Sequence, residues 1–440
     1  MIRSLRQSLA GVLVLFSLPA TLSAQTMVTL EDAMARARAD TAGARAMAAG
    51  VAEAAARVTQ ARSRFLPRVD ITESVQRGNE PVFVFSTLLS QRRFTAANFD
   101  VQNLNNPAAE TNVRTALAMT QPIYDASTAL GVRAAELQRD LVTVDQRQGT
   151  QDLALTAARS FVQVLRLEAA ERASAAAVAA AESDLDRAKQ RRDVGLVTDA
   201  DVLALEVHLA DVRQEQIATG GDLAVARLEL TEALGLPLDQ PVLLVRPTPA
   251  AAPTDTALLT RQALDARPER KQAEIQVQLA ETDRRLAQAA FLPRVGIDAG
   301  WEFNGSSWTK QRSGWLVGAR VDLNVFDGLA NRARVNAARQ AETRTAAERE
   351  RIERRIEVDV RGAVARVTTA RARETAGRAA LTQARERQRI IRDRYDVGLA
   401  TVTDVLRAAE AVFDAEARAT AAEMDAILET VALDRATGRL

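Results

Sequence analysis

Near the middle of the chain the sequence reads Arg192-Asp193-Val194-Gly195-Leu196-Val197-Thr198, followed by Asp199-Ala200-Asp201-Val202-Leu203. Near the end it reads Arg394-Tyr395-Asp396-Val397-Gly398-Leu399-Ala400-Thr401, followed by Val402-Thr403-Asp404-Val405-Leu406. The glycine of each copy lacks a Cβ and can end a helix in the left-handed conformation. The threonine three residues later can cap a second helix. Each copy therefore predicts a sharp turn, here called a tip, between two helices.

The sequence around the two tips is repeated as well. Phe65-Leu66-Pro67-Arg68-Val69 recurs as Phe291-Leu292-Pro293-Arg294-Val295, and Pro122-Ile123-Tyr124-Asp125 corresponds to Asn324-Val325-Phe326-Asp327. The order of segments is the same in both halves, which indicates a duplicated unit. We expect repeats at residues 25–236 and 268–440, joined by a linker at 237–267.

Each repeat has the same expected elements. In the first, strands cover about 67–78 and 112–123, a long helix covers 126–193, the tip is 194–198 and a return helix runs to about 235. In the second, strands cover about 294–304 and 314–326, a long helix covers 328–396, the tip is 397–401 and a return helix runs to about 437. The long helix from Ala126 to Asp193 contains no proline. At 1.5 Å per residue it would be about 100 Å long, so it must pack on neighbours along its length.

The remaining segments are less regular. We expect a helix from Thr29 to about Arg64, with a break near Gly43 and Gly50 and an end before Pro67. Residues 79–109 are rich in Asn, Phe and Pro and predict an extended loop. The prolines of residues 237–254 predict an absence of regular structure. A short helix follows, and another begins at Pro268.

The first 24 residues resemble a secretory signal peptide. Arg3 and Arg6 precede an apolar run from Leu9 to Leu18, and cleavage after Ala24 is plausible. The run is short for a membrane span, although a retained anchor helix is the alternative. We therefore expect an exported protein.

The composition excludes several functions. The net charge of +1 provides no field that would select nucleic acid, and the absence of cysteine excludes disulfides and a lipidated cysteine anchor. The single histidine, His208, lies within a helical run. No nucleophile elbow, phosphate loop or metal-ligand spacing is present, so we expect no enzyme, cofactor or metal site.

The strand segments alternate apolar and polar residues over about ten positions, which is typical of membrane-spanning β-strands. All three tryptophans, Trp301, Trp308 and Trp315, fall in the second pair of strands and fit a membrane-interface belt. The alternative is a soluble hairpin with one face on a core. Four strands cannot close a barrel, so in a membrane several chains would share one.

Taken together, the two Val-Gly-Leu-x-Thr tips, the paired Phe-Leu-Pro junctions and the strand pairs resemble the TolC-like outer-membrane efflux protein family. The segments Glu80-Pro81-Val82-Phe83-Val84-Phe85 and Gln91-Arg92-Arg93-Phe94 look like the first extracellular loop of one branch. The resemblance implies a mainly α fold with transmembrane β structure. Three chains would build a twelve-stranded barrel continued by a periplasmic helical barrel. It also implies a passive exit channel that works with a periplasmic adaptor and an inner-membrane RND, ABC or MFS transporter.

The resemblance assigns roles to individual residues. The adaptor would contact the two tips, at Val194, Gly195, Leu196, Thr198, Val397, Gly398, Leu399 and Thr401. The channel entrance would be narrowed by Asp404 and its counterpart Asp201, although Arg407 stands where some members carry a second acid. As a hypothesis, Tyr395 and Asp396 form hydrogen bonds to a neighbouring helix that hold the entrance closed. The competing interpretation is a soluble periplasmic coiled-coil adaptor, which does not explain the amphipathic strands.

Overall fold

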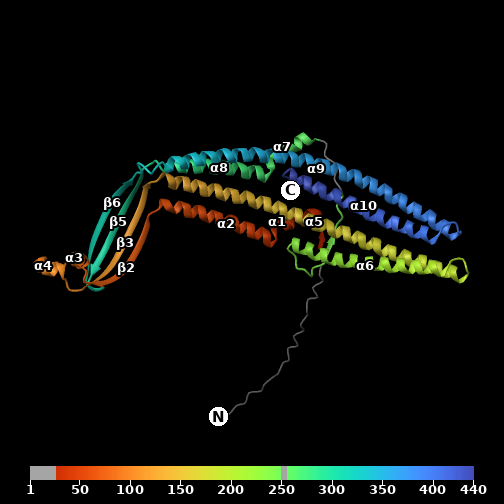
Figure 1. Cartoon of the computed structure of the whole chain (residues 1–440), viewed down its shortest axis with the longest axis horizontal. Helices are drawn as coiled ribbons and strands as arrows, with labels where there is room; N and C mark the ends of the chain where they lie inside the picture. The colour runs from red at the N-terminus through yellow and green to blue at the C-terminus, as the bar shows by residue number, and fades with distance from the viewer. Residues whose placement is uncertain (1–25, 249–254) are drawn as a thin grey trace, which may run out of the picture.

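The computed structural model describes residues 26–248 and 255–440. The expected signal peptide at residues 1–24 lies outside them. The protein is elongated, with a β-sheet at one end and long helices side by side along the rest of its length (Figure 1). The sheet is antiparallel, with the strand order β2-β3-β5-β6. Its strands are β2 (Arg68–Gly78), β3 (Glu110–Tyr124), β5 (Arg294–Gly305) and β6 (Gln311–Asp322).

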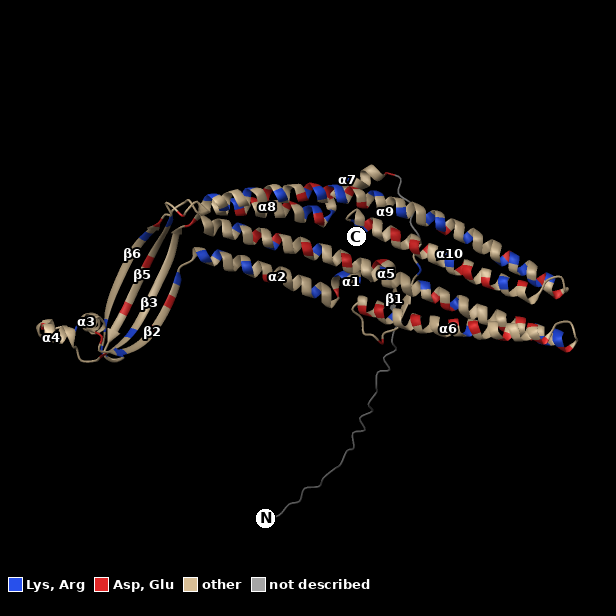
Figure 2. Ribbon diagram, in the orientation of Figure 1, with Lys and Arg blue, Asp and Glu red and all other residues tan. Residues whose placement is uncertain are grey.

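Two helical hairpins form the other end of the molecule. One consists of α5 (Ala126–Asp193) and α6 (Asp199–Ala233), and the other of α9 (Ala330–Asp396) and α10 (Val402–Ala436). Each hairpin packs along its own length, and α5 also packs on α10, so the helices lie side by side in the order α6-α5-α10-α9 (Figure 1). Charged side chains of both signs occur along all four helices (Figure 2). Within the described ranges, no helix is both long enough and apolar enough to cross a membrane.

The second repeat differs slightly from its expected bounds. β6 ends at Asp322, which pairs with Arg294 at the start of β5, so residues 323–326 have no strand beside them in this pairing. The long helix begins at Ala330 and not at residue 328. Gly328 and Leu329 both have positive φ angles, 68° and 74°. A helix cannot continue through two left-handed residues, so α9 starts after them.

The predicted break at Gly43 and Gly50 is wrong. Both glycines lie inside α2 (Ala42–Arg62), and the break falls at residues 40–41, after α1 (Leu30–Ala39). The Thr41 hydroxyl accepts a hydrogen bond from the Ala44 backbone N–H at 3.2 Å. This N-cap places the start of the new helix at residue 42, before both glycines.

The expectation of an extended loop at residues 79–109 is also wrong. The segment contains α3 (Pro81–Ser90), the 3₁₀ turn η2 (Ala96–Phe99) and α4 (Val101–Asn105); a similar turn, η1 (Ser63–Phe65), precedes β2. Pro81 occupies the first turn of α3, where its fixed φ favours a helix. The rings of Phe85, Phe94 and Phe99 meet edge to face, with centroids 4.9 and 5.0 Å apart. These tertiary contacts order a segment that has no helical period.

The proline-rich linker contains regular structure. Its β4 (Val242–Leu244) pairs in parallel with β1 (Thr26–Val28), so the prediction of an irregular segment is wrong there. The linker continues with α7 (Thr256–Ala266), and α8 begins at Pro268 as expected and ends at Ala289. The two short strands join the first described residues to the middle of the chain. They lie beside the main apolar core, whose buried members include Val28, Phe161, Leu223, Leu230 and Val431.

A group of ion pairs joins the linker to the long helices. Arg267, only 8% exposed, binds Glu269 at 2.7 Å and Asp359 of α9 at 3.1 Å. Arg435 of α10 binds Glu269 at 3.3 Å and Asp152 of α5 at 2.6 Å. Burial alone would raise the pKa of Glu269, but hydrogen bonds from Arg267 and from the backbone, with the charges of Arg267 and Arg435, hold this pKa below its usual value.

We expect Glu269→Gln to lower the thermal unfolding temperature of the helical part, because it leaves Arg267 buried with one partner fewer. The cost is about 3 kcal/mol, the lower end for breaking a buried pair. Since the pKa of Glu269 is lowered by folding, the stabilisation is complete above the unfolded pKa and is lost as pH falls through the folded pKa. Circular dichroism melts at pH 7 and at acidic pH measure both effects.

Glu281→Gln is the matched control. Glu281 lies in the same helix and pairs with Arg285, but the two side chains are 38% and 59% exposed. Its loss should change stability by less than about 1 kcal/mol. Equal effects of the two substitutions at pH 7 would contradict the role given to the buried ion pairs.

Candidate functional site: the β-sheet and the helical tips

The two faces of the sheet differ sharply. One carries large, exposed apolar side chains, including Ile71, Trp315, Val317 and Val321. The other carries charges, with Arg114 paired to Glu302 across β3 and β5, and Arg320 paired to Asp298 at 3.2 Å across β6 and β5. Exposed apolar residues on a continuous sheet face suit contact with lipid, whereas the charged face suits water.

The tryptophans lie in the β5–β6 hairpin. Trp301 and Trp315 are direct cross-strand partners, and Trp308 is in the turn that joins the strands. The Trp301 and Phe303 rings are stacked with centroids 6.0 Å apart. All three indoles are exposed. Their role at a membrane interface stays a prediction.

The two tips have nearly the same backbone geometry. Gly195 and Gly398 have φ angles of 76° and 78°. In the second tip the Gly398 N–H donates to the Tyr395 carbonyl at 3.0 Å, and the Leu399 N–H donates to the Arg394 carbonyl at 2.8 Å. These bonds satisfy the last carbonyl groups of α9 and turn the chain back.

Capping boxes start both return helices. The Thr401 hydroxyl accepts from the Asp404 N–H at 3.2 Å, and the Thr401 N–H donates to the Asp404 carboxylate at 3.0 Å. Thr198 and Asp201 repeat this pattern at the first tip. The backbone and side-chain hydrogen bonds from Thr401 lower the pKa of Asp404. The two aspartates proposed for the entrance therefore also hold the tips in shape.

Each tip presents apolar side chains to its surroundings. Val194, Leu196, Val397 and Leu399 are each exposed by about two thirds, from 67% to 70%. Their backbones are fixed by the turn, so they form a preformed apolar surface. Such a surface fits contact with another protein.

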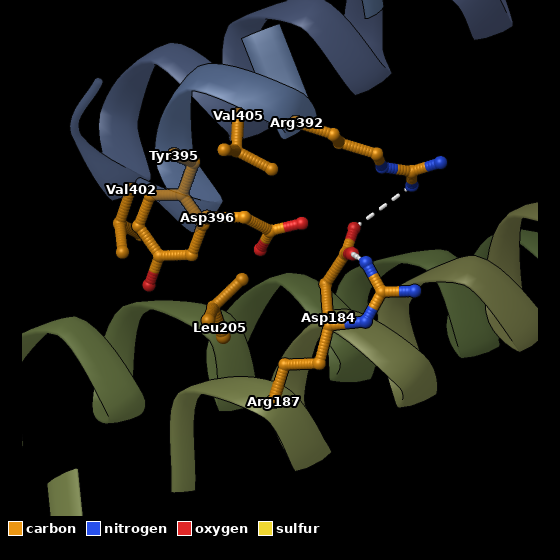
Figure 3. A pocket seen from close by; sticks show the side chains of 8 residues that line it. All are labelled: Asp184, Arg187, Leu205, Arg392, Tyr395, Asp396, Val402 and Val405. Atoms are coloured by element: carbon orange, nitrogen blue, oxygen red, sulfur yellow. Dashed lines mark hydrogen bonds and ion pairs between the residues drawn. The ribbon is translucent and has the colours of Figure 1, made fainter. Parts of the chain in front are cut away.

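The two hairpins are joined just above the tips. Arg392 of α9 binds Asp184 of α5 at 2.9 Å, and both side chains face the gap between the hairpins (Figure 3). Arg191 of α5 donates to the backbone carbonyls of Tyr395 and Asp396 at 2.7 and 2.9 Å. The guanidinium of Arg191 also lies 4.8 Å from the centre of the Tyr395 ring.

The Tyr395 hydroxyl takes no part in the contacts with the neighbouring helix. Its oxygen is buried, and no hydrogen-bond partner for it exists within residues 26–248 and 255–440. Burial raises the pKa of this hydroxyl, with Arg191 acting in the opposite direction. The Asp396 carboxylate lies 3.9 Å from Arg191. The contacts of Tyr395 with the other hairpin are made by its ring and its backbone carbonyl, and its role in a gate stays a prediction.

A groove of about 570 Å³ lies above the tips and is lined by residues of α5, α6, α9 and α10. His208 and Arg407 both lie on its walls, and alanines of α5 form part of its lining. Among the residues that the structure describes, no three His, Asp or Glu side chains are arranged to hold a metal ion.

Asp184, Arg191 and Arg392 were not singled out from the sequence. Arginines and acids occur throughout the four helices (Figure 2), and most such pairs lie on solvated surfaces. No local motif marks these three residues. Only the distance between α5 and α9 distinguishes them.

The sequence matches the family model described as outer membrane efflux protein over residues 34–236 and 259–439. The chain belongs to the outer membrane efflux protein family. It is a protein of the outer membrane that extends into the periplasm, and it is not an enzyme. The match covers both repeats, including the strands and the tips.

Individual relatives agree with this family membership. The outer membrane protein TolC of Vibrio cholerae is 24% identical over 365 residues, which cover 81% of this chain and 83% of the relative. The structure of VceC from Vibrio cholerae superposes with a TM-score of 0.75 at 18% identity, covering 93% of this chain and 96% of that one. The CmeC channel of Campylobacter jejuni gives 0.77 at 15% identity, with 93% and 85% covered.

We expect Gly398→Ala to loosen the second tip of this efflux protein, because φ = 78° costs a residue with a Cβ roughly 1–2 kcal/mol. Amide hydrogen exchange around the turn should become roughly 5- to 30-fold faster. Gly221→Ala in α6 is the control. Its added Cβ meets no atom within 4 Å, and alanine favours a helix interior, so exchange there should slow or stay unchanged. Unchanged exchange at the tip of Gly398→Ala would contradict the strain argument.

Proposed function

We propose that this protein is the outer-membrane exit channel of a tripartite efflux or type I secretion system. Three copies form one barrel and one helical tunnel, through which substrates pass passively from an inner-membrane RND, ABC or MFS transporter and a periplasmic adaptor. The proposed channel uses no cofactor and binds no nucleic acid. We infer that each copy is built from the two repeats and the linker at residues 237–267.

The main support for this proposal is the open edge on each side of the sheet. Its four strands leave β2 and β6 as edges, each paired on one side only within the described chain. Lipid provides no partner for unpaired backbone groups, so an open sheet with a lipid-facing apolar side needs strands from other copies. Three copies of four strands give twelve, which is within the range of closed outer-membrane barrels.

The tips support the contact with an adaptor. Their exposed apolar residues lie at the end of the molecule farthest from the sheet (Figure 1), which would be the periplasmic end. We infer that Val194, Leu196, Val397 and Leu399 contact the adaptor. The two glycines and two threonines shape this surface.

The cross-hairpin contacts support a gate at the same end. Arg191 and the Asp184–Arg392 pair hold the α5–α6 hairpin against α9 just above the tips. Separation of the hairpins would break these contacts and widen the entrance. Asp201 and Asp404 would give the entrance a negative charge that favours cations, while Arg407 would reduce this preference.

A soluble periplasmic adaptor would also have long antiparallel helices. It is not favoured, because it gives no reason for a sheet whose exposed apolar face carries Ile71, Trp315 and Val321. Membership of the outer membrane efflux protein family points the same way.

The test of the proposal is planar-bilayer conductance of the detergent-purified protein, with its mass determined in parallel. We expect about three times the mass of one chain and discrete, cation-biased openings. A monodisperse, detergent-independent monomer without channel events would contradict the proposal.

For the gate, we expect Arg191→Ala to increase the open probability about tenfold or more, because it removes two charge-assisted hydrogen bonds worth roughly 1.5–3 kcal/mol each. Lys189→Ala is the control: Lys189 pairs with Glu206 at 3.0 Å inside one hairpin and does not join the two. Single-channel recording measures both variants. Equal open probability in Arg191→Ala and the wild type would exclude this gate.

A further inference from the structure

The segment between β2 and β3, here called the outer segment (Pro81–Asn105), lies at the end of the sheet away from the helices (Figure 1). Gln91, 2% exposed, donates to the Asn112 side chain at 3.1 Å, and Arg93 donates to Glu110 at 2.9 Å. Asn112 in turn donates to Asn304 at 2.9 Å.

These contacts show on which face of the sheet the outer segment lies. Glu110, Asn112 and Arg114 are two residues apart along β3, so their side chains lie on the same face of the sheet. This face also carries the ion pair between Arg114 and Glu302. That is the charged face. α3 is therefore attached to the side of the sheet that cannot contact lipid and that, in a closed barrel, faces the lumen.

α3 is apolar on both of its sides. Val84 and Leu88 are buried against the rest of the chain, whereas Val82 is 73% and Leu89 49% exposed. Farther along the outer segment, Phe99 and Val101 are also exposed. A single copy thus leaves an apolar surface uncovered on the water-filled side of its own sheet.

The size of the proposed barrel indicates what covers this surface. Twelve strands spaced about 4.8 Å apart and tilted about 40° give a circumference of roughly 75 Å and a diameter of roughly 24 Å. An α-helix with its side chains is about 10–12 Å wide. This diameter is measured between strand backbones, and the strand side chains take up about 5 Å at each wall, which leaves about 14 Å. Three touching helices of about 11 Å need a circle of about 24 Å. The α3 helices of three copies, which lie at the outer end of the sheet (Figure 1), would therefore come into contact across the mouth of the barrel.

We propose that the α3 helices of three copies meet on the channel axis and form an apolar constriction at the outer mouth. The exposed side of each α3 is covered by α3 of the other two copies. The inference rests on the trimeric barrel proposed above. The outer constriction would resist ions by dewetting, because its surface is apolar. It would be chemically distinct from the ionic contacts near the tips.

The natural chain contains no cysteine, which permits a clean test. Val82→Cys and Leu89→Cys are prepared separately in the full-length protein and oxidised with copper(II) phenanthroline in detergent. We expect dimers of cross-linked chains on non-reducing gels for at least one variant. Trp315→Cys is the control, because Trp315 is 75% exposed but lies on the apolar face, and it should not cross-link.

Conductance provides the second measurement. The double substitution Val82→Asp with Leu89→Asp should raise single-channel conductance at least about twofold by wetting the constriction. A trimer that conducts normally, does not cross-link at either position and is unaffected by the double substitution would overturn the constriction while leaving the proposed function intact. Loss of both the trimeric mass and the channel events in the wild type would instead overturn the proposed function.

Discussion

The structure depends on the need of every backbone N–H and C=O group for a hydrogen-bond partner. Within one copy the sheet meets this need only in its interior, and β2 and β6 remain as edges. Because one face of the sheet is apolar and exposed, water is not the natural partner for those edges. The proposed assembly of three copies follows from this constraint together with the alternation of the strands.

The helical part satisfies its backbone groups internally and has a different requirement. The long helices have 68 and 67 residues, and an isolated helix cannot bury its apolar side chains. The chain therefore turns back at each tip, and a helix of 35 residues packs along the long one. Left-handed glycines end the long helices, and capping boxes begin the return helices. The same local chemistry at both tips gives two hairpins of matching length, which pack through α5 and α10.

The two ends of the molecule use different interactions. Near the tips, arginines bind carboxylates and backbone carbonyls across the gap between the hairpins, and such contacts can break and re-form in water. At the outer end, buried amides fix α3 to the charged face of the sheet and leave apolar side chains uncovered. An ionic gate and an apolar constriction would respond differently to salt, pH and substrate.

The sequence by itself determined the elements that depend on local chemistry. Gly195, Gly398 and the two capping threonines specified the tips, the proline-free run specified α5, and alternation specified the strands. Membership of the efflux family was also predictable from these motifs. The tertiary structure alone decided features that depend on distant contacts. The pairing of β1 with β4 and the end of β6 at Asp322 each require a partner strand elsewhere in the chain. Residues 81–105 fold through side-chain contacts, among them those of three phenylalanines, that no helical period announces. For the same reason Asp184, Arg191 and Arg392 could not be chosen in advance. Their residue types are common on these helices, and only the approach of α5 to the end of α9 near the tips brings them together.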